Sequence, residues 1–419
     1  MTRAALERLS TDLGERSTYD AASQCSRCGY CEQACPTYVA TGSELKSPRG
    51  RNQLVRLIWE GGLRDPAAAE QALSSCLLCG ACSTACYAHV PTADIVLEGR
   101  RRIGAHWLAR RLAAHPSWLP KALKAALWLK RLGLSRLARP FLKRLGLKGL
   151  ASADEHLAEA PSRFLCEELK ERARPLSPAW LYFAACGTHY LYPRVGRATV
   201  RLLEAQGPGL CLDFRCCGLM AYNYGSLEDA RKLARAVIEG SEPFPAPVVA
   251  DCSSCAAFLK KYPQLFLDDA PWRTRAEAFA ARVRDSIEAV GSTEGLTPWR
   301  GGVVTYHDSC RACHGQGLAG PRERLKAVCG GSWRELPESD VCCGGAGAFA
   351  FTQPELSDEV LRRKIGRIAA LRASVVLTSS TSCLAQLAHG FKKYYPDATV
   401  RHLSEFLAER LPNPPPHGT

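Results

Sequence analysis

The 419-residue chain contains no uninterrupted run of about 18 apolar residues, so the sequence predicts no transmembrane helix. Its N-terminus, Met1–Arg8, includes Glu7 and lacks an apolar core, which predicts no signal peptide. The glycines of Gly344–Gly347 lack the G-x-G-x-x-G spacing and follow a cysteine pair rather than a strand, so no flavin or nicotinamide fingerprint is present. No Ser–His–Asp order stands out. The sequence therefore predicts no site that oxidises an organic substrate directly.

Acidic residues are missing from one long segment, residues 100–148, which carries 14 Lys and Arg and no Asp or Glu. The whole chain has 55 Lys and Arg against 41 Asp and Glu, so this segment accounts for the entire net charge of +14. Apolar residues repeat at helical spacing here and cations occupy another face, which predicts an amphipathic helix. The apolar residues are Leu137, Phe141 and Leu145, and the cations are Arg136, Arg139 and Lys143.

Three tryptophans, Trp107, Trp118 and Trp128, add the amphipathic rings that are typical of a membrane–water boundary. The segment therefore predicts a peripheral membrane surface on the cytoplasmic side, without a spanning helix. A solvated face and a partner-binding helix pair stay open as alternatives. Nucleic acid is not expected as a partner, because no recognised DNA-binding motif accompanies the cations.

Cysteine, by contrast, is abundant, with 21 residues. Abundant cysteine without a signal peptide predicts a reducing, cytoplasmic compartment in which thiols serve as ligands. Eight of them form two runs, Cys25-Ser-Arg-Cys28-Gly-Tyr-Cys31-Glu-Gln-Ala-Cys35-Pro36 and Cys76-Leu-Leu-Cys79-Gly-Ala-Cys82-Ser-Thr-Ala-Cys86-Tyr87. The first run has the C-x2-C-x2-C-x3-C-P spacing that binds cubane [4Fe–4S] clusters. The second run departs from it only in having Tyr87 in place of proline, which we expect to affect solvent access rather than ligation.

In two-cluster ferredoxins the fourth cysteine of each run ligates the other cluster. This crossing predicts two sets of ligands: Cys25, Cys28, Cys31 and Cys86 for one cubane cluster, and Cys76, Cys79, Cys82 and Cys35 for the other. Structural zinc uses two CxxC pairs separated by a longer loop, and disulfides need an oxidising compartment, so neither alternative fits this spacing. Short helices such as Leu54–Trp59, after a loop at Ser47–Arg51, are expected around the clusters.

From about residue 178 the pattern changes to short apolar strands that alternate with helical segments, which predicts α/β structure. Each expected strand leads to a cysteine, where the carboxyl ends of parallel strands collect ligands. The strands are Trp180–Ala184, Val248–Ala250, Val303–Tyr306 and Val375–Thr378, and they lead to Cys186, Cys252, Cys310 and Cys383. A Cys-Cys-Gly motif lies between the two strands of each pair, at Cys216–Gly218 and Cys342–Gly344. The order predicts two repeated lobes.

This unit resembles the CCG (cysteine-rich) domain of heterodisulfide reductases, in which five cysteines hold a non-cubane [4Fe–4S] cluster. The resemblance implies one such cluster in the first lobe, on Cys186, Cys216, Cys217, Cys252 and Cys255. A second, less complete site is implied on Cys310, Cys342, Cys343 and Cys383, where Gln386 stands in the place expected for the last cysteine. Cys313 is a candidate replacement, and His307, Asp308 and His314 are expected to support Cys310 rather than to ligate. A buried structural pair or a vicinal disulfide is the alternative for each Cys-Cys motif. The roles of Cys166, Cys211 and Cys329 stay open.

The order of these parts resembles the iron–sulfur subunit of glycolate oxidase, and the lactate-utilisation iron–sulfur protein and anaerobic glycerol-3-phosphate dehydrogenase contain related chains. Motifs that carry the resemblance include Cys31-Glu-Gln-Ala-Cys-Pro-Thr37, Ser47-Pro-Arg-Gly-Arg51, Cys342-Cys-Gly-Gly-Ala-Gly347 and Gln353-Pro-Glu-Leu356. The expected fold is an α domain followed by α/β lobes. The expected parts are a ferredoxin-like domain with two [4Fe–4S] clusters (1–99), a basic helical linker (100–177), two CCG lobes (178–300 and 301–411) and a disordered tail (412–419).

The resemblance implies an electron-transfer subunit that oxidises no substrate itself. An FAD-containing 2-hydroxy-acid dehydrogenase would supply electrons, and a quinone or another acceptor would receive them. One alternative is a heterodisulfide-reductase-like catalytic subunit, which disulfide reductase activity of the isolated chain would reveal. A non-enzymatic iron–sulfur sensor is the lower alternative.

Overall fold

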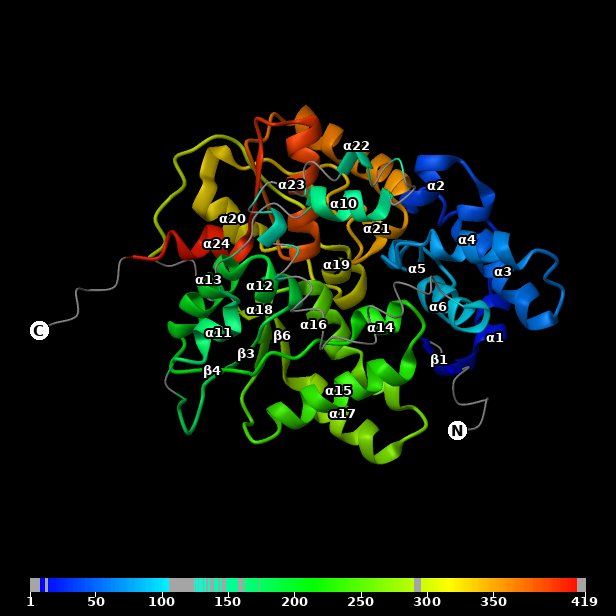
Figure 1. Cartoon of the computed structure of the whole chain (residues 1–419), viewed down its shortest axis with the longest axis horizontal. Coiled ribbons are helices and arrows are strands. Elements are labelled where there is room, and N and C mark those ends of the chain that lie inside the picture. The colour runs from blue at the N-terminus through cyan, green and yellow to red at the C-terminus, as the bar shows by residue number, and fades with distance from the viewer. Residues whose placement is uncertain are drawn as a thin grey trace, which may run out of the picture.

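The computed structural model describes residues 8–11, 14–104, 148–156, 163–172, 174–289 and 295–412, together with isolated positions between 124 and 161. The N-terminal helices lie at one end of the molecule, beside two α/β lobes that pack against each other (Figure 1). No helix among the described residues is long and apolar enough to cross a bilayer. The expected tail, 412–419, lies outside this description apart from its first residue.

The N-terminal part is helical after a short hairpin. Its elements are β1 (Arg8–Thr11), β2 (Gly14–Ser17), α1 (Thr18–Ser23), α2 (Pro36–Thr41), α3 (Pro48–Glu60), α4 (Pro66–Ser74), α5 (Ala81–Thr84) and α6 (Thr92–Ile103). Val55, Leu73 and Ile95 are fully buried at its centre. The segment Ser47–Arg51, which we expected to be a loop, instead forms the first turn of α3. Ser47 caps this helix by accepting a hydrogen bond from the Gly50 amide at 2.9 Å, and proline is compatible with the first helical position.

The first lobe is built on four parallel strands in the order β4-β3-β5-β6. The strands are β3 (Leu181–Phe183), β4 (Leu210–Cys211), β5 (Val248–Ala250) and β6 (Val283–Asp285). The helices are α11 (Leu165–Leu169), α12 (Cys186–Tyr190), α13 (Pro193–Glu204), α14 (Leu219–Asn223), α15 (Leu227–Ser241), α16 (Ser253–Lys260), α17 (Ala270–Arg282) and α18 (Ser286–Ala289). The two central strands are buried along their whole length, as apolar strands covered on both faces require.

The second lobe has three parallel strands in the order β7-β8-β9, and a parallel bridge joins Val304 to Trp333 on the other side of β7. The strands are β7 (Val304–Tyr306), β8 (Val375–Thr378) and β9 (Thr399–His402). The helices are α19 (Cys310–Gln316), α20 (Arg322–Cys329), α21 (Phe349–Thr352), α22 (Pro354–Ala370), α23 (Thr381–Tyr394) and α24 (Leu403–Ala408). The four strands expected from the sequence are therefore present, whereas β4, β6 and β9 were not foreseen.

The two lobes share a buried interface. Helix α24 packs on α13, and α16 packs on α19. At the centre of the interface the Ser253 amide donates to the Ser379 carbonyl at 3.0 Å, and the two side-chain hydroxyls are 2.8 Å apart. The strand ends of both lobes therefore meet at this contact.

The basic segment is described only at isolated positions before α10 (Lys148–His156). Lys130 and Arg139 both pair with Asp154 of α10, and Lys124 lies 3.0 Å from Glu167 of α11. Some of the cations are thus neutralised within the protein. Most of the predicted amphipathic helix falls outside the described residues, namely Arg136, Leu137, Lys143, Leu145, Trp107 and Trp118.

Arg51 on α3 holds the N-terminal helices together. Its guanidinium is buried, and it donates to the Ala72 carbonyl (3.1 Å), the Thr37 hydroxyl (3.0 Å) and the Ser75 hydroxyl (2.9 Å). Its Nη1 also lies 3.8 Å from the Cys35 sulfur. One buried cation therefore connects α2, α3, α4 and the residue that follows α4.

We expect Arg51→Met to lower the free energy of unfolding of the chain by about 3 kcal/mol, because buried acceptors lose a charged donor. Urea denaturation followed by circular dichroism would measure the loss. Arg49→Met is the matched control, because Arg49 lies two residues away and pairs with Glu44 and Glu32 at the surface. Equal losses in the two variants would contradict the role given to Arg51.

Candidate metal centres

The two N-terminal cysteine runs share one backbone conformation. In each run the residue before the second cysteine and the glycine after it are left-handed, with φ of 61° and 82° at Arg27 and Gly29, and 52° and 87° at Leu78 and Gly80. A non-glycine residue with positive φ is uncommon, so its repetition at one motif position indicates a specific loop geometry. The loops curl tightly enough that the Leu78 amide lies 3.4 Å from the Cys76 sulfur.

The runs are interleaved rather than separate. Burial, followed by the neighbouring thiols of Cys25, Cys86 and Cys35, raises the pKa of Cys31 to about 11. Burial and the thiols of Cys76 and Cys35 likewise raise the pKa of Cys82. The last cysteine of each run thus lies beside the first three of the other run, which is the proximity that crossed ligation requires.

The first run reaches the surface, whereas the second is enclosed. Cys28 is exposed, and Cys82 is buried. Tyr30 and Tyr87 are 59% and 84% exposed, and their rings lie 5.2 Å apart between centroids. The tyrosine that replaces the expected proline therefore forms an exposed aromatic pair with Tyr30.

In the first lobe, the five predicted cysteines converge. The sulfurs of Cys186 and Cys216 lie 3.6 Å apart, and those of Cys217 and Cys255 lie 3.5 Å apart. A hydrogen bond from Cys255, the largest of several causes, lowers the pKa of Cys252 well below its usual range, so this thiol joins the same group.

In the second lobe, the four predicted cysteines also converge. The sulfurs of Cys310 and Cys342 lie 4.0 Å apart. The pKa of Cys343 lies well above its usual range, and its causes include hydrogen bonds with Cys342 and Cys383. The Cys-Cys-Gly turns of the two lobes share one geometry: Gly218 and Gly344 both have φ of 88°, and their amides lie 3.5 Å and 3.4 Å from the first sulfur of each pair.

The missing cysteine of the second lobe is at position 380, not at 386 as we expected. Cys252 is the N-cap of α16, which follows β5, and Ser380 is the N-cap of α23, which follows β8. Counting three residues into each helix places Cys383 level with Cys255. The sequence comparison failed because four residues separate β8 from Cys383, whereas only one separates β5 from Cys252.

Gln386 has a separate structural role. Its amide donates to the Ser357 hydroxyl at 2.9 Å, and its oxygen lies 2.9 Å from Nε2 of His156 on α10. Cys313 does not replace the missing ligand, because its thiol donates to the Ser309 carbonyl of its own helix at 3.4 Å. Both residues therefore lie outside the group of four sulfurs.

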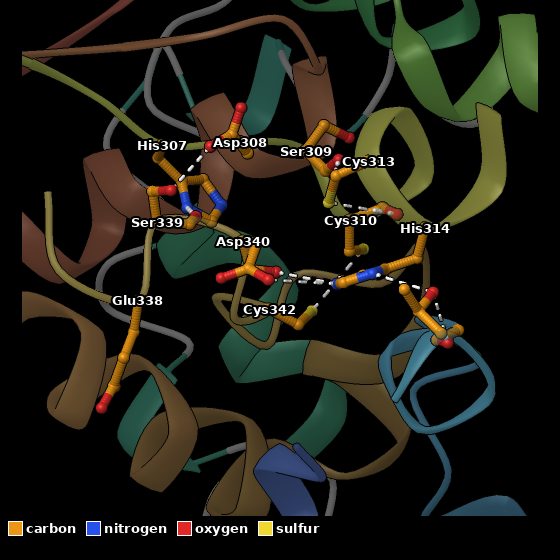
Figure 2. A network of polar contacts seen from close by, with 12 residues as sticks. His307, Asp308, Ser309, Cys310, Cys313, His314, Glu338, Ser339, Asp340 and Cys342 are labelled. Atoms are coloured by element: carbon orange, nitrogen blue, oxygen red, sulfur yellow. Dashed lines mark hydrogen bonds and ion pairs between the residues drawn. The ribbon is translucent and has the colours of Figure 1, made fainter. Parts of the chain in front are cut away.

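The three polar residues around Cys310 differ in their contacts (Figure 2). Asp308 accepts hydrogen bonds from Arg322 at 2.6 Å and from the Ser339 hydroxyl at 2.7 Å, so it is structural. His314 lies between the Thr84 hydroxyl (3.2 Å) and the Asp340 carbonyl (3.4 Å), and it connects this lobe with the second cysteine run. His307 is fully buried, and burial lowers its pKa to about 3, so its imidazole is neutral.

The N-terminal part and the second lobe meet at their cysteines. A Cβ added at Gly80 would lie 3.2 Å from the Cβ of His314, so glycine permits this close approach. Leu77, Cys310 and Cys342 belong to one buried cluster, and the partly buried Cys79 packs against it. The second run and the second lobe therefore bring their sulfurs to a shared boundary.

The remaining cysteines lie away from these groups. Cys166 and Cys211 border a cavity of about 440 Å³ on the other side of the first lobe. Burial raises the pKa of Cys166 to about 12 and that of Cys211 to about 11. Cys329 packs into the core of the second lobe. These three thiols are core residues in the structure.

Comparison with known proteins matches each of the three parts. Residues 21–90 match the 4Fe-4S dicluster domain family, and residues 180–260 and 304–388 both match the cysteine-rich domain family. The two cysteine-rich matches end at equivalent residues of α16 and α23, in agreement with the pairing of Cys255 with Cys383.

Three relatives illustrate the full-length similarity. The "Probable glycolate oxidase iron-sulfur subunit" of Bacillus subtilis is 27% identical over 97% of this chain and 98% of its own length. The glycolate oxidase iron-sulfur subunit of Escherichia coli is 26% identical, over 92% and 93%. Lactate utilization protein A of an Exiguobacterium strain is 33% identical, over 54% of this chain and 96% of its own length. The chain belongs to the family of glycolate oxidase iron–sulfur subunits and lactate utilization protein A.

Proposed function

We propose that the chain is the iron–sulfur electron-transfer subunit of a flavin-dependent 2-hydroxy-acid oxidoreductase. The observation that carries this proposal is the grouping of 17 of the 21 cysteines into neighbouring sulfur clusters, all of them free of disulfides. Bound [4Fe–4S] clusters supply one-electron transfer, with potentials between roughly −700 and +450 mV. The names of the relatives support glycolate or lactate as the class of substrate at a partner subunit.

We assign the ligands by proximity. Two cubane clusters would be held by Cys25, Cys28, Cys31 and Cys86, and by Cys76, Cys79, Cys82 and Cys35. Further [4Fe–4S] clusters would be held in the first lobe by Cys186, Cys216, Cys217, Cys252 and Cys255, and in the second by Cys310, Cys342, Cys343 and Cys383. The donor sets fit, because buried and closely spaced thiols are the ligands that iron–sulfur clusters use.

Buried cations support these assignments. Arg51 lies against Cys35, and Lys364 is 3% exposed and feels the thiols of Cys342 and Cys343. A thiolate-ligated cluster carries negative charge, which such cations offset in a medium of low dielectric constant. We therefore take 1–99 as the ferredoxin-like domain, 178–300 and 301–411 as repeated lobes, and 100–177 as the linker.

The exposed end of the first run is the proposed docking site for the flavoprotein. Cys28 is exposed here, and Tyr30 and Tyr87 form a solvent-facing aromatic pair beside it. Exposed aromatic residues are typical anchors of protein interfaces. A partner seated on them would bring its flavin close to the most accessible cysteine.

We further propose that the basic segment attaches the chain to the cytoplasmic membrane face, beside a quinone that accepts the electrons. Trp128, Leu132 and Phe141 are 59%, 54% and 64% exposed. Such apolar exposure next to an excess of cations is typical of an interfacial helix.

Electron acceptance tests the function. A flavin-dependent 2-hydroxy-acid dehydrogenase with its substrate should bleach the visible cluster absorbance of the anaerobically purified chain. The double variant Tyr30→Glu, Tyr87→Glu should slow this step about tenfold, because the aromatic anchors are lost. Leu176→Glu is the control, because Leu176 is 98% exposed outside the proposed docking site. Absence of bleaching in the parent would refute the proposal.

Crossed ligation gives a separate prediction. Cys86→Ser should alter the electron paramagnetic resonance spectrum as Cys28→Ser does, because both residues serve the cluster of the first run. Cys79→Ser should produce the other pattern. If Cys86→Ser instead matches Cys79→Ser, each run holds its own cluster.

Membrane attachment can be measured by liposome co-sedimentation. The parent should bind anionic vesicles and lose binding as salt rises, at about 1 kcal/mol per engaged Lys or Arg. Replacing Trp128 and Phe141 by serine should weaken binding at constant salt, whereas Leu176→Ser should not. Unchanged binding of the double variant would mean that this apolar face serves another purpose.

A further inference from the structure

His307 is the one residue around the second-lobe sulfurs that sequence reasoning undervalued. It follows β7 directly and is fully buried. Its Nδ1 lies 3.0 Å from the carbonyl oxygen of Ser339. Since a carbonyl can only accept, Nδ1 must carry the proton, and Nε2 must carry a lone pair.

The ring is held firmly in this orientation (Figure 2). The hydroxyl of Ser339 donates to Asp308 at 2.7 Å and receives a hydrogen bond from Arg322 at 3.0 Å. The Asp308 amide also donates to the Ser339 carbonyl at 3.2 Å. A histidine whose Nδ1 is fixed by a backbone carbonyl is the usual arrangement for a metal ligand that binds through Nε2.

The free nitrogen points at sulfur. Nε2 of His307 is buried and has no hydrogen-bond partner among the described residues. A ring nitrogen of His307 and the sulfurs of Cys343 and Cys383 all lie within 4.8 Å of one another. Nδ1 is occupied by Ser339, so Nε2 is the nitrogen available to a metal. A buried acceptor without a partner is costly, and a metal would remove that cost.

The lobes differ at two positions together. Three residues before the strand-end cysteine, the first lobe has Phe183 where the second has His307. At the N-cap of the following helix, the first lobe has Cys252 where the second has Ser380. The lobe that lacks a thiol is therefore the lobe that gains an imidazole.

We propose that Nε2 of His307 is a ligand of the second-lobe iron–sulfur cluster and supplies the donor that Ser380 cannot. The site would combine four thiolates with one imidazole, whereas the first-lobe site has five thiolates. This inference rests on the proposed function, which places a cluster in the second lobe. Imidazole in place of thiolate raises cluster potentials in Rieske-type centres, so the two lobes would differ in potential.

Pulsed electron paramagnetic resonance on the full chain tests the proposal directly. Chain labelled with ¹⁵N-histidine should show a directly coordinated nitrogen. His307→Phe, which introduces the residue of the first lobe, should abolish that coupling and lower the iron content by about four per chain. His314→Phe is the matched control, because both of its nitrogens have oxygen neighbours. This control should retain both the coupling and the iron.

The double variant His307→Phe, Ser380→Cys separates loss of a ligand from loss of folding. It should regain the iron through a fifth thiolate and still lack the nitrogen coupling. The inference is overturned if the labelled parent shows no histidine coupling or if His307→Phe retains it. If replacing Cys342 and Cys343 by serine removes no iron from the parent, the second-lobe cluster itself is absent, and the proposed function loses that centre.

Discussion

Thiols packed a few ångströms apart in a dry interior cannot all ionise unless positive charge compensates them. The sulfur pairs of the two lobes lie 3.5 to 4.0 Å apart. Desolvation and mutual repulsion raise the pKa of most of these cysteines, including Cys79, Cys217 and Cys343. Such a protein is poorly compensated without metal, and metal binding would release protons and contribute to folding. This constraint explains why each sulfur group lies where chain segments end and cations approach.

The arrangement of the groups follows from the same constraint. The interleaved runs bring Cys35 and Cys86 across to the opposite partners, and Arg51 secures the crossing by connecting α2, α3 and α4. Gly80 allows the second run to meet His314 of the second lobe. The strand ends of the two lobes then meet through Ser253 and Ser379. Four sulfur groups are thus carried on neighbouring surfaces of one chain, as transfer of electrons over short distances requires.

The sequence predicted the chemistry better than the geometry. Cysteine spacing identified the runs and lobes, because iron–sulfur ligands must recur at fixed intervals, and four apolar strands were confirmed. Short strands with weak patterns, such as Leu210–Cys211, depend on tertiary packing and were missed. The missing thiol was placed at Gln386 because counting along the chain cannot detect a longer loop after β8. The strand register identifies Ser380 instead, and only the fold shows that His307 faces Cys343 and Cys383.

The central claim, that the lobes hold clusters as well as the runs, is tested most directly by the iron content of the anaerobically purified full chain. The account predicts about 16 irons per chain, and about 12 after Cys216 and Cys217 are both replaced by serine. A parent with about eight irons, unchanged by that double replacement, would contradict it and leave only the two cubane clusters.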